Sequence, residues 1–204
     1  MIDWARSRHV DAEALPAVFT LAQLLWRRGS LAEAATELGA ARAAASTHPT
    51  ERGRRSIDML LGMVALSRGD LIAAHDHIVV ALRYRMANGY HWAACEALTA
   101  MAVRCAVGGE MTQAATLFGA AQAARARLRS QQGVIGPMGR RHESGVRNTM
   151  GDTAFDNAYG DGAAMTLAEA TAYALAVEHP DLTHALVRLS IDTDPTTDLS
   201  LPTF

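Results

Sequence analysis

Apolar residues follow one another three or four positions apart over the first 130 residues, which is the spacing of one face of an α-helix. The pattern also returns every 40 residues. The positions in register are Leu21, Leu61 and Met101; Ala22, Gly62 and Ala102; Leu38, Ile78 and Phe118; and Ala41, Ala81 and Ala121. A fixed period of this length is typical of stacked helical repeats, so three such units are predicted between residues 11 and 130.

Each unit is predicted to be an antiparallel pair of helices that turns at a glycine. The three glycines, Gly29, Gly69 and Gly109, stand in register in the segments RRGSLAEAA, SRGDLIAAH and VGGEMTQAA. Glycine can take the positive φ that ends the first helix, and the next residue can cap the second helix by accepting a backbone N–H bond. The cap candidates are Ser30, Asp70 and Glu110. Small residues at the shared alanine and glycine positions let two helices approach closely.

This layout resembles a tetratricopeptide repeat lengthened from about 34 residues. The extra length is expected between units, in segments 46–51 and 86–91, which contain the helix breakers Pro49 and Gly89. Alanine is abundant and β-branched runs are scarce, which favours helix throughout. The predicted fold is therefore all-α, with antiparallel helix pairs stacked as a tetratricopeptide-like superhelix and a helical extension at the C-terminal side.

The periodic pattern stops after the third unit. Glycines and Pro137 predict a linker over 130–139, followed by helices near 140–150, 154–159 and 166–176, the last with a capping box formed by Thr166 and Glu169. A short helix is expected over 181–190. The predicted organisation is thus repeats over 1–130, an extension over 131–190 and a disordered, non-periodic tail over 191–204.

The start of the chain is predicted to be a partial repeat. Applied backwards, the 40-residue offset makes residues 1–9 the end of a second helix, with Trp4 and Val10 at an open end of the stack. An uncovered apolar end favours association, so we expect it to pack against an upstream domain or, most simply, a second copy in a symmetric homodimer.

Composition narrows the class of protein. No stretch reaches the roughly 18 uninterrupted apolar residues of a membrane span, and the charged N-terminal segment does not look like a secretion signal, so no membrane association and a cytoplasmic location are expected.

Cys95 and Cys105 lie ten residues apart on one predicted helix, too far for a disulfide, and are interpreted as small core residues.

The charges are unevenly distributed. The 19 basic residues are all arginine, and the absence of lysine excludes Schiff-base chemistry and the GxxxxGK[ST] phosphate loop. Six arginines and one acid, Glu143, lie between Arg125 and Arg147, whereas nine acids and one arginine follow from Asp152 onward. The basic segment can meet an acidic partner or the chain's own acidic end, and we favour the second because Arg125 and Arg129 also complement the negative end of their helix.

Part of the chain resembles a known family of regulators. Leu117, Phe118, Gly119, Ala120 and Ala121 form an LFGAA motif; Gly151, Phe155, Ala158, Tyr159 and Gly162 form a G-x-x-x-F-x-x-A-aromatic-x-x-G segment; and Thr166, Leu167, Glu169 and Ala170 form a T/S-L-x-E-A helix. Residues 109–176 thereby resemble the C-terminal end of the helical-repeat region of large actinobacterial transcriptional regulators of the LuxR and related ATPase or cyclase-fused types. The resemblance implies a module that receives or relays a signal through protein or small-molecule contact, while the family's chemistry lies in other domains.

Three classes of function follow from these patterns. We expect a non-catalytic scaffold for protein interaction or signal sensing, without cofactor or metal; the alternatives are a DNA-binding regulator and a helical enzyme without a recognisable motif. If there is a ligand, it is expected against the first helices of the pairs, where the polar residues Arg54, Asp58 and Arg104 interrupt apolar positions. The segment 30–46 is similar to the first helix and turn of a helix-turn-helix, but its Gly39 is in register with Gly119 inside a predicted helix, so we do not expect direct nucleic-acid binding.

Histidines and methionines suggest further sites that the spacing disfavours. His75 and His77 flank Asp76, but residues two apart on a helix point in nearly opposite directions and do not share an ion. His179 and His184 could converge across a proline turn, although no third ligand is nearby. The methionines Met59, Met63 and Met101 are interpreted as core residues rather than a cofactor site.

Overall fold

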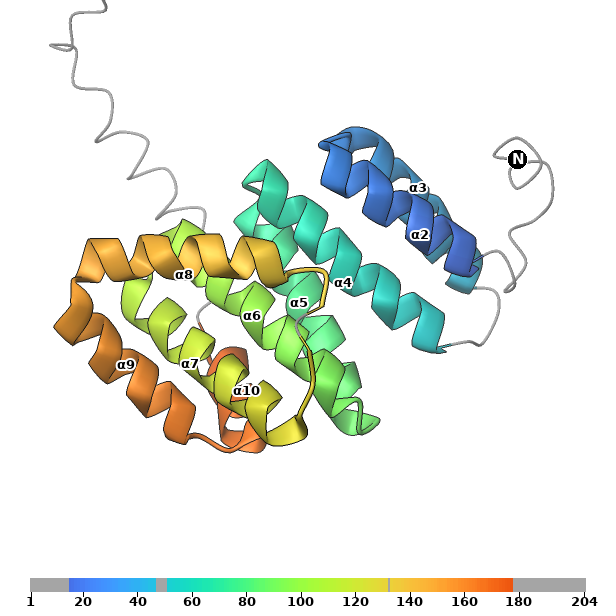
Figure 1. Cartoon of the computed structure of the whole chain (residues 1–204). Coiled ribbons are helices and arrows are strands. Elements are labelled where there is room, and N and C mark those ends of the chain that lie inside the picture. Colours follow the sequence, from blue (N-terminus) through green and yellow to red (C-terminus); the bar gives the residue numbers. More distant parts are fainter. Residues whose placement is uncertain (1–14, 47–50, 132, 178–204) are drawn as a thin grey trace, which may run out of the picture.

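The computed structural model describes residues 15–46, 51–131 and 133–177, and every regular element in these ranges is an α-helix (Figure 1). The helices are α2 (Leu15–Arg28), α3 (Leu31–Ser46), α4 (Glu51–Arg68), α5 (Leu71–Ala87), α6 (His91–Gly108), α7 (Met111–Leu128), α8 (Gly136–Met150), α9 (Asp152–Ala164) and α10 (Leu167–Leu175). The prediction of an all-α fold is confirmed.

The first six of these helices form three pairs whose boundaries recur every 40 residues. The second helix of each pair begins at Leu31, Leu71 and Met111, and the first helix of each pair ends at Arg28, Arg68 and Gly108. Within each pair the two helices contact each other, and each later first helix contacts both helices of the pair before it: α4 contacts α2 and α3, and α6 contacts α4 and α5. The apolar pattern thus coincides with one packing relation used repeatedly along the chain.

The glycine turns inside the pairs share one geometry. Gly29, Gly69 and Gly109 have φ values of 84°, 75° and 83°. At the first of them, the Gly29 N–H donates to the Trp26 carbonyl at 3.0 Å and the Ser30 N–H to the Leu25 carbonyl at 2.9 Å, and the same pair of bonds recurs at the other two glycines. This Schellman motif needs a left-handed residue, and glycine takes that conformation without the strain that a Cβ brings.

Only part of the predicted helix capping is found after these turns. The Asp70 carboxylate accepts a hydrogen bond from the Ala73 N–H at 3.0 Å, as expected of an N-cap residue. Glu110 makes no such bond, so the prediction of a cap there is wrong. Its carboxylate pairs instead with the fully buried guanidinium of Arg104. Leaving a buried charge without a counter-charge costs more free energy than leaving a helix start without a side-chain cap.

The core of the pairs is built from small residues beside large ones. Ala34, Ala74 and Ala114 are fully buried, and so are their larger neighbours Leu38 and Ile78. A Cβ added at Gly62 on α4 would lie 3.1 Å from the Ile78 side chain on α5, which shows how closely these two helices approach. Residues with little or no side chain at these positions set the helix separation, and the branched side chains fill the remaining space.

The three C-terminal helices pack on the third pair. Helix α8 contacts α6 and α7, the relation that α6 has to α4 and α5, so it adds one more helix to the stacked arrangement. Helix α9 contacts α7 extensively, and α10 contacts both α6 and α7. This group lies at the end of the molecule opposite α2 and α3 (Figure 1).

Helices α7 and α9 meet backbone to backbone. A Cβ added at Gly119 on α7 would lie 2.0 Å from the Tyr159 carbonyl oxygen, and one added at Gly162 on α9 would lie 1.8 Å from the Thr116 carbonyl oxygen. Each helix therefore presents a glycine to the other helix's backbone. Any side chain at either position would push the helices apart, since neither carbonyl can move without breaking its own helix.

Two boundaries in this region differ from the sequence prediction. Helix α8 begins at Gly136, within the predicted linker, because Pro137 occupies the first turn of the helix, where its missing N–H is not needed. Helix α9 runs from Asp152 to Ala164 rather than 154–159, continuing through Gly160 and Gly162. The capping box of α10 is confirmed, with the Thr166 hydroxyl accepting from the Glu169 N–H at 3.2 Å. The predictions for residues 1–10 and 181–204 lie outside the described residues.

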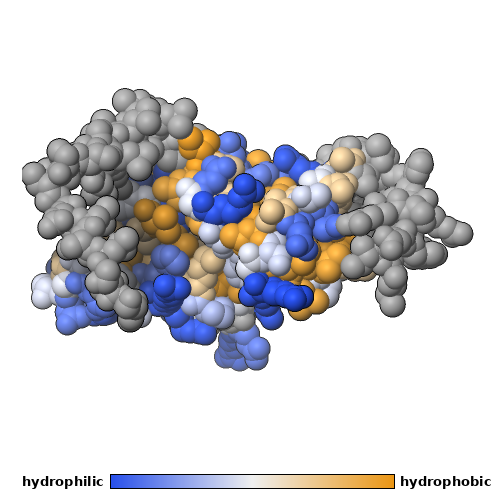
Figure 2. Space-filling view, turned by 90° about the horizontal axis from the view of Figure 1, so that it is seen from above, coloured by the Kyte–Doolittle hydropathy of each residue, from blue (hydrophilic) through white to orange (hydrophobic). Residues whose placement is uncertain are grey.

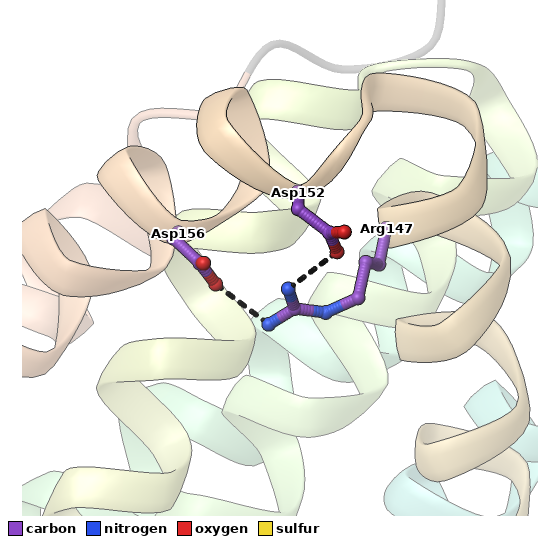
Figure 3. Close-up of polar contacts among 3 residues, drawn as sticks. All are labelled: Arg147, Asp152 and Asp156. Carbon is purple, nitrogen blue, oxygen red and sulfur yellow. Dashed lines mark hydrogen bonds and ion pairs between the residues drawn. The ribbon is translucent and has the colours of Figure 1, made fainter.

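Several residues of the arginine-rich segment bind other parts of the same chain. The Arg147 guanidinium at the end of α8 pairs with the Asp152 and Asp156 carboxylates of α9 at 2.9 and 2.7 Å, as Figure 3 shows, and lies 4.2 Å from the centre of the Phe155 ring. Arg127 donates to the Ala163 carbonyl at 2.7 Å and to the Met165 carbonyl, at the C-terminal end of α9. Arginines 127 and 147 thus fix α9, through its acidic start and its electronegative end.

We predict that Gly162→Ala lowers the free energy of unfolding by about 3 kcal/mol, since the added methyl group has no space between α9 and α7. The matched control is Gly160→Ala, two residues earlier on the same helix, where the space beside the glycine is open. That change is expected to stabilise the protein by about 0.5–1 kcal/mol through the higher helix propensity of alanine. Urea denaturation followed by circular dichroism measures both, and equal effects of the two substitutions would contradict the close contact.

Candidate functional site

A cavity of about 500 Å³ opens between the first helices of the three pairs. Its apolar wall is formed by Phe19 of α2, Met59, Leu60 and Met63 of α4, Ala93 of α6, and Val134 from the segment that follows α7. The end of α5 and the start of α6 add Tyr84, Tyr90 and Trp92, and the polar side chains that line it are Gln23, Arg85 and Glu96. Cavities of this size and composition are typical of small-molecule sites.

Aromatic side chains stand at the α5–α6 side of the cavity. The rings of Tyr84 and Tyr90 lie 6.0 Å apart between centroids and are tilted by 40°. Trp92 is 62% exposed, unusually open for so large an apolar side chain. Figure 2, a view from above the orientation of Figure 1, shows further apolar surface between hydrophilic residues. The described surface therefore offers apolar area to a partner or a ligand, and at the cavity that area is aromatic.

The turn between α5 and α6 places these rings. Gly89 has a φ of 70°, and the Gly89 and Tyr90 N–H groups bond to the Met86 and Arg85 carbonyls at 3.2 and 2.8 Å, the same Schellman geometry as inside the pairs. The turn ends α5 just after Tyr84 and Arg85 and starts α6 just before Trp92. Gly89, which the sequence analysis placed in the extra length of the repeat, thus positions the aromatic residues on one side of the cavity.

Arg85 is the basic side chain in the cavity lining. Its Nη1 donates to the Ala93 carbonyl at 2.8 Å, in the first turn of α6. Burial lowers the pKa of Arg85 to about 10, and the negative charge of Glu96 opposes this effect. The guanidinium remains charged at neutral pH, in surroundings that solvate its charge poorly.

Glu96 holds the segment that forms part of the cavity wall. Its carboxylate oxygens accept hydrogen bonds from the Gly133 N–H at 3.0 Å and the Ile135 N–H at 3.4 Å. A Cβ at Gly133 would lie 2.7 Å from the same carboxylate, so a residue without a side chain suits this position. Between these two anchored amides lies Val134, which completes the wall.

The polar residues that the sequence analysis selected have other roles. The Asp58 carboxylate is 1% exposed and pairs with Arg42 Nε of α3 and His77 Nδ1 of α5, both at 3.4 Å. Arg104 is fully buried in its pair with Glu110. Neither Asp58 nor Arg104 lines the cavity. The residues of α4 that do so are Leu60 and the predicted core residues Met59 and Met63. Arg54 belongs to α4, but its side chain, like Trp4 and Val10, lies outside the described residues.

The other candidates from the sequence are the histidines, the two cysteines and the segment similar to a helix-turn-helix. His75 is buried, His77 pairs with Asp58, and Asp76 is exposed. In the described ranges no three histidine, cysteine or acidic side chains gather as metal ligands would, and His179 and His184 lie outside these ranges. Both cysteines are free and buried, and burial raises the pKa of Cys105 to about 12. Helix α3 continues without a break through Gly39, where a helix-turn-helix would need its turn.

Sequence reasoning expected a ligand against the first helices of the pairs but selected as its contacts none of the residues that line the cavity, although one signal for them was present. Aromatic residues are only 5% of the chain, yet Tyr84, Tyr90 and Trp92 fall within one short segment around a glycine turn. Such a local concentration of aromatic rings at a turn favours a surface that binds a ligand or a partner. Arg85 and Glu96 carry no signal in sequence, because their importance depends on the α5–α6 turn and the 133–135 segment lying together.

Comparisons of the chain with protein-family models, with curated proteins and with solved structures find no match. Within the described part of the chain, none of the helices combines the length and the apolar composition that crossing a membrane requires.

We predict that replacing both Arg42 and His77 by alanine lowers the free energy of unfolding by about 3 kcal/mol, because the buried Asp58 carboxylate loses two of its polar partners. Adding Asp58→Asn to this double variant should recover part of the loss, since a neutral amide tolerates burial better than a carboxylate. Urea denaturation of the three proteins gives the comparison. A triple variant no more stable than the double variant would show that the charge of Asp58 is not what the two partners compensate.

Proposed function

We propose that this chain is a non-catalytic helical-repeat module of a cytoplasmic bacterial transcriptional-regulator system, and that it receives or relays a signal by binding a ligand in the cavity between α2, α4 and α6. The observation that carries the proposal is the cavity itself, about 500 Å³ in volume and lined by residues from all three helix pairs, from the α5–α6 turn and from the segment after α7. A molecule bound there would contact several units at once, so its binding energy would act on their relative positions.

The lining chemistry favours binding over catalysis. The charged groups that line the cavity are one guanidinium, hydrogen-bonded to a backbone carbonyl, and one carboxylate, occupied by two backbone N–H groups. Such groups orient a ligand, whereas acid–base chemistry usually needs a titratable group held near neutral pKa beside the reacting atoms. The aromatic and methionine side chains around them provide apolar contact area.

The resemblance to the repeat regions of LuxR-type and ATPase-type regulators supports the same function. Its motif residues include Gly119 and Gly162, which make the backbone contact between α7 and α9, and Phe155, which is fully buried beneath Arg147. Motifs that build helix contacts fit a domain whose part in the regulator is recognition, with nucleotide or DNA chemistry in other domains.

Binding of the neutral fluorescent probe N-phenyl-1-naphthylamine tests this proposal. We expect saturable binding to the wild-type chain with an increase in fluorescence, and about tenfold or more weaker binding to Ala93→Leu, because the larger side chain occupies the cavity. The matched control is Ala126→Leu, the same substitution at an exposed position of α7, which should bind as the wild type does. Absence of saturable binding, or equal loss in both variants, would contradict the cavity as the binding site.

A further inference from the structure

The geometry of the cavity points to a class of ligand: a small organic anion, such as a carboxylate with an aromatic or aliphatic body, whose negative charge pairs with Arg85. This inference rests on the proposed function and makes it specific. It follows from the placement of three kinds of group in the lining, namely a guanidinium, an anchored carboxylate and an apolar wall.

The guanidinium has hydrogen-bonding capacity to spare. Arginine carries five N–H donors, and the hydrogen bond that Arg85 makes within the described part of the chain uses one of them, to the Ala93 carbonyl. That bond fixes the guanidinium against the first turn of α6 and leaves in-plane N–H donors, two of which can bind a carboxylate side by side. An anion placed there would supply the counter-charge that burial makes valuable.

Glu96 supplies this counter-charge only in part. Both of its oxygens accept backbone N–H groups of the 133–135 segment, and no ion pair within 4.0 Å joins it to Arg85 among the described residues. A cationic ligand would share the Glu96 oxygens with these amides and would also meet the positive charge of Arg85. The arrangement therefore favours an anion over a cation, even though the lining holds one charge of each sign.

The apolar wall sets the body of the ligand. Tyr84 and Tyr90, whose ring centroids lie 6.0 Å apart, line the cavity together with Arg85, and Met59 and Met63 line it from α4. Methionine side chains adapt to the shape of a ligand, and aromatic rings provide flat contact surfaces. Trp92, 62% exposed without a ligand, would gain cover from a bound molecule.

Three competitors that share one body and differ in charge test the inference. They are 4-phenylbutyrate, 4-phenylbutan-1-ol and 4-phenylbutylamine, each used to displace N-phenyl-1-naphthylamine from the full chain at neutral pH. The carboxylate is expected to bind about tenfold more tightly than the alcohol, and the amine more weakly than the alcohol. In Arg85→Gln the advantage of the carboxylate over the alcohol should disappear while the alcohol's affinity is kept.

The control is Arg83→Gln, which removes an exposed arginine from the same helix and should leave the order of the three competitors unchanged. A thermal melt of each variant shows whether it is folded. If Arg85→Gln is unfolded, the wild-type chain alone tests the anion inference. It should bind the carboxylate more tightly than the amine, and high salt should abolish this preference. Equal affinity for the three competitors, preference for the amine, or no displacement of the bound probe by any of them would overturn the anion inference but keep the proposed cavity function. Absence of saturable probe binding to the wild-type chain would overturn both.

Discussion

The close approach of helix backbones through residues with little or no side chain is the constraint on which the rest of this structure depends. Fully buried alanines recur at the same place in each of the three pairs, and glycines take their role where α7 meets α9. Close contact fixes the separation and angle of neighbouring helices, because a closely packed interface leaves no space into which one helix could move. The described helices are therefore closely packed, and the cavity of about 500 Å³ lies beside this packed framework.

The position of the cavity follows from that frame. Each first helix packs on both helices of the preceding pair, so α2, α4 and α6 follow one another along one side of the stack. Large residues such as Met59, Met63 and Trp92 line the space between them incompletely, and the segment after α7 covers part of it through the bonds from Gly133 and Ile135 to Glu96. This segment leads directly into α8, which the contacts with α6 and α7 hold in place. Helix α8 thus supports the segment that contributes Gly133 and Val134, while none of the described lining residues belongs to α8, α9 or α10.

Much of the helical frame could be predicted from the sequence, because it depends on local and periodic information. The 40-residue register locates the helix boundaries, the positive φ at Gly69 is required by the Schellman motif, and Thr166 with Glu169 forms its capping box within four residues. Features that depend on which helices meet could not be predicted in this way. Glu110 stands at the N-cap position of α7, but its carboxylate pairs with Arg104. Helix α9 continues through Gly162, the glycine that contacts α7. The buried carboxylate of Asp58 is compensated by Arg42 and His77, which come from neighbouring helices. The cavity belongs to the same group, since its residues come from three pairs.

The cavity between the first helices is the central claim, and methyl NMR of methionine tests it most directly. With ¹³C-labelled methionine methyl groups and saturating 4-phenylbutyrate, the account predicts shifted resonances for Met59 and Met63, which line the cavity, and an unshifted resonance for the fully buried Met101, which does not. Substitution of each methionine by leucine assigns the signals. Saturable binding that moves other methionine resonances and leaves those of Met59 and Met63 in place would contradict it.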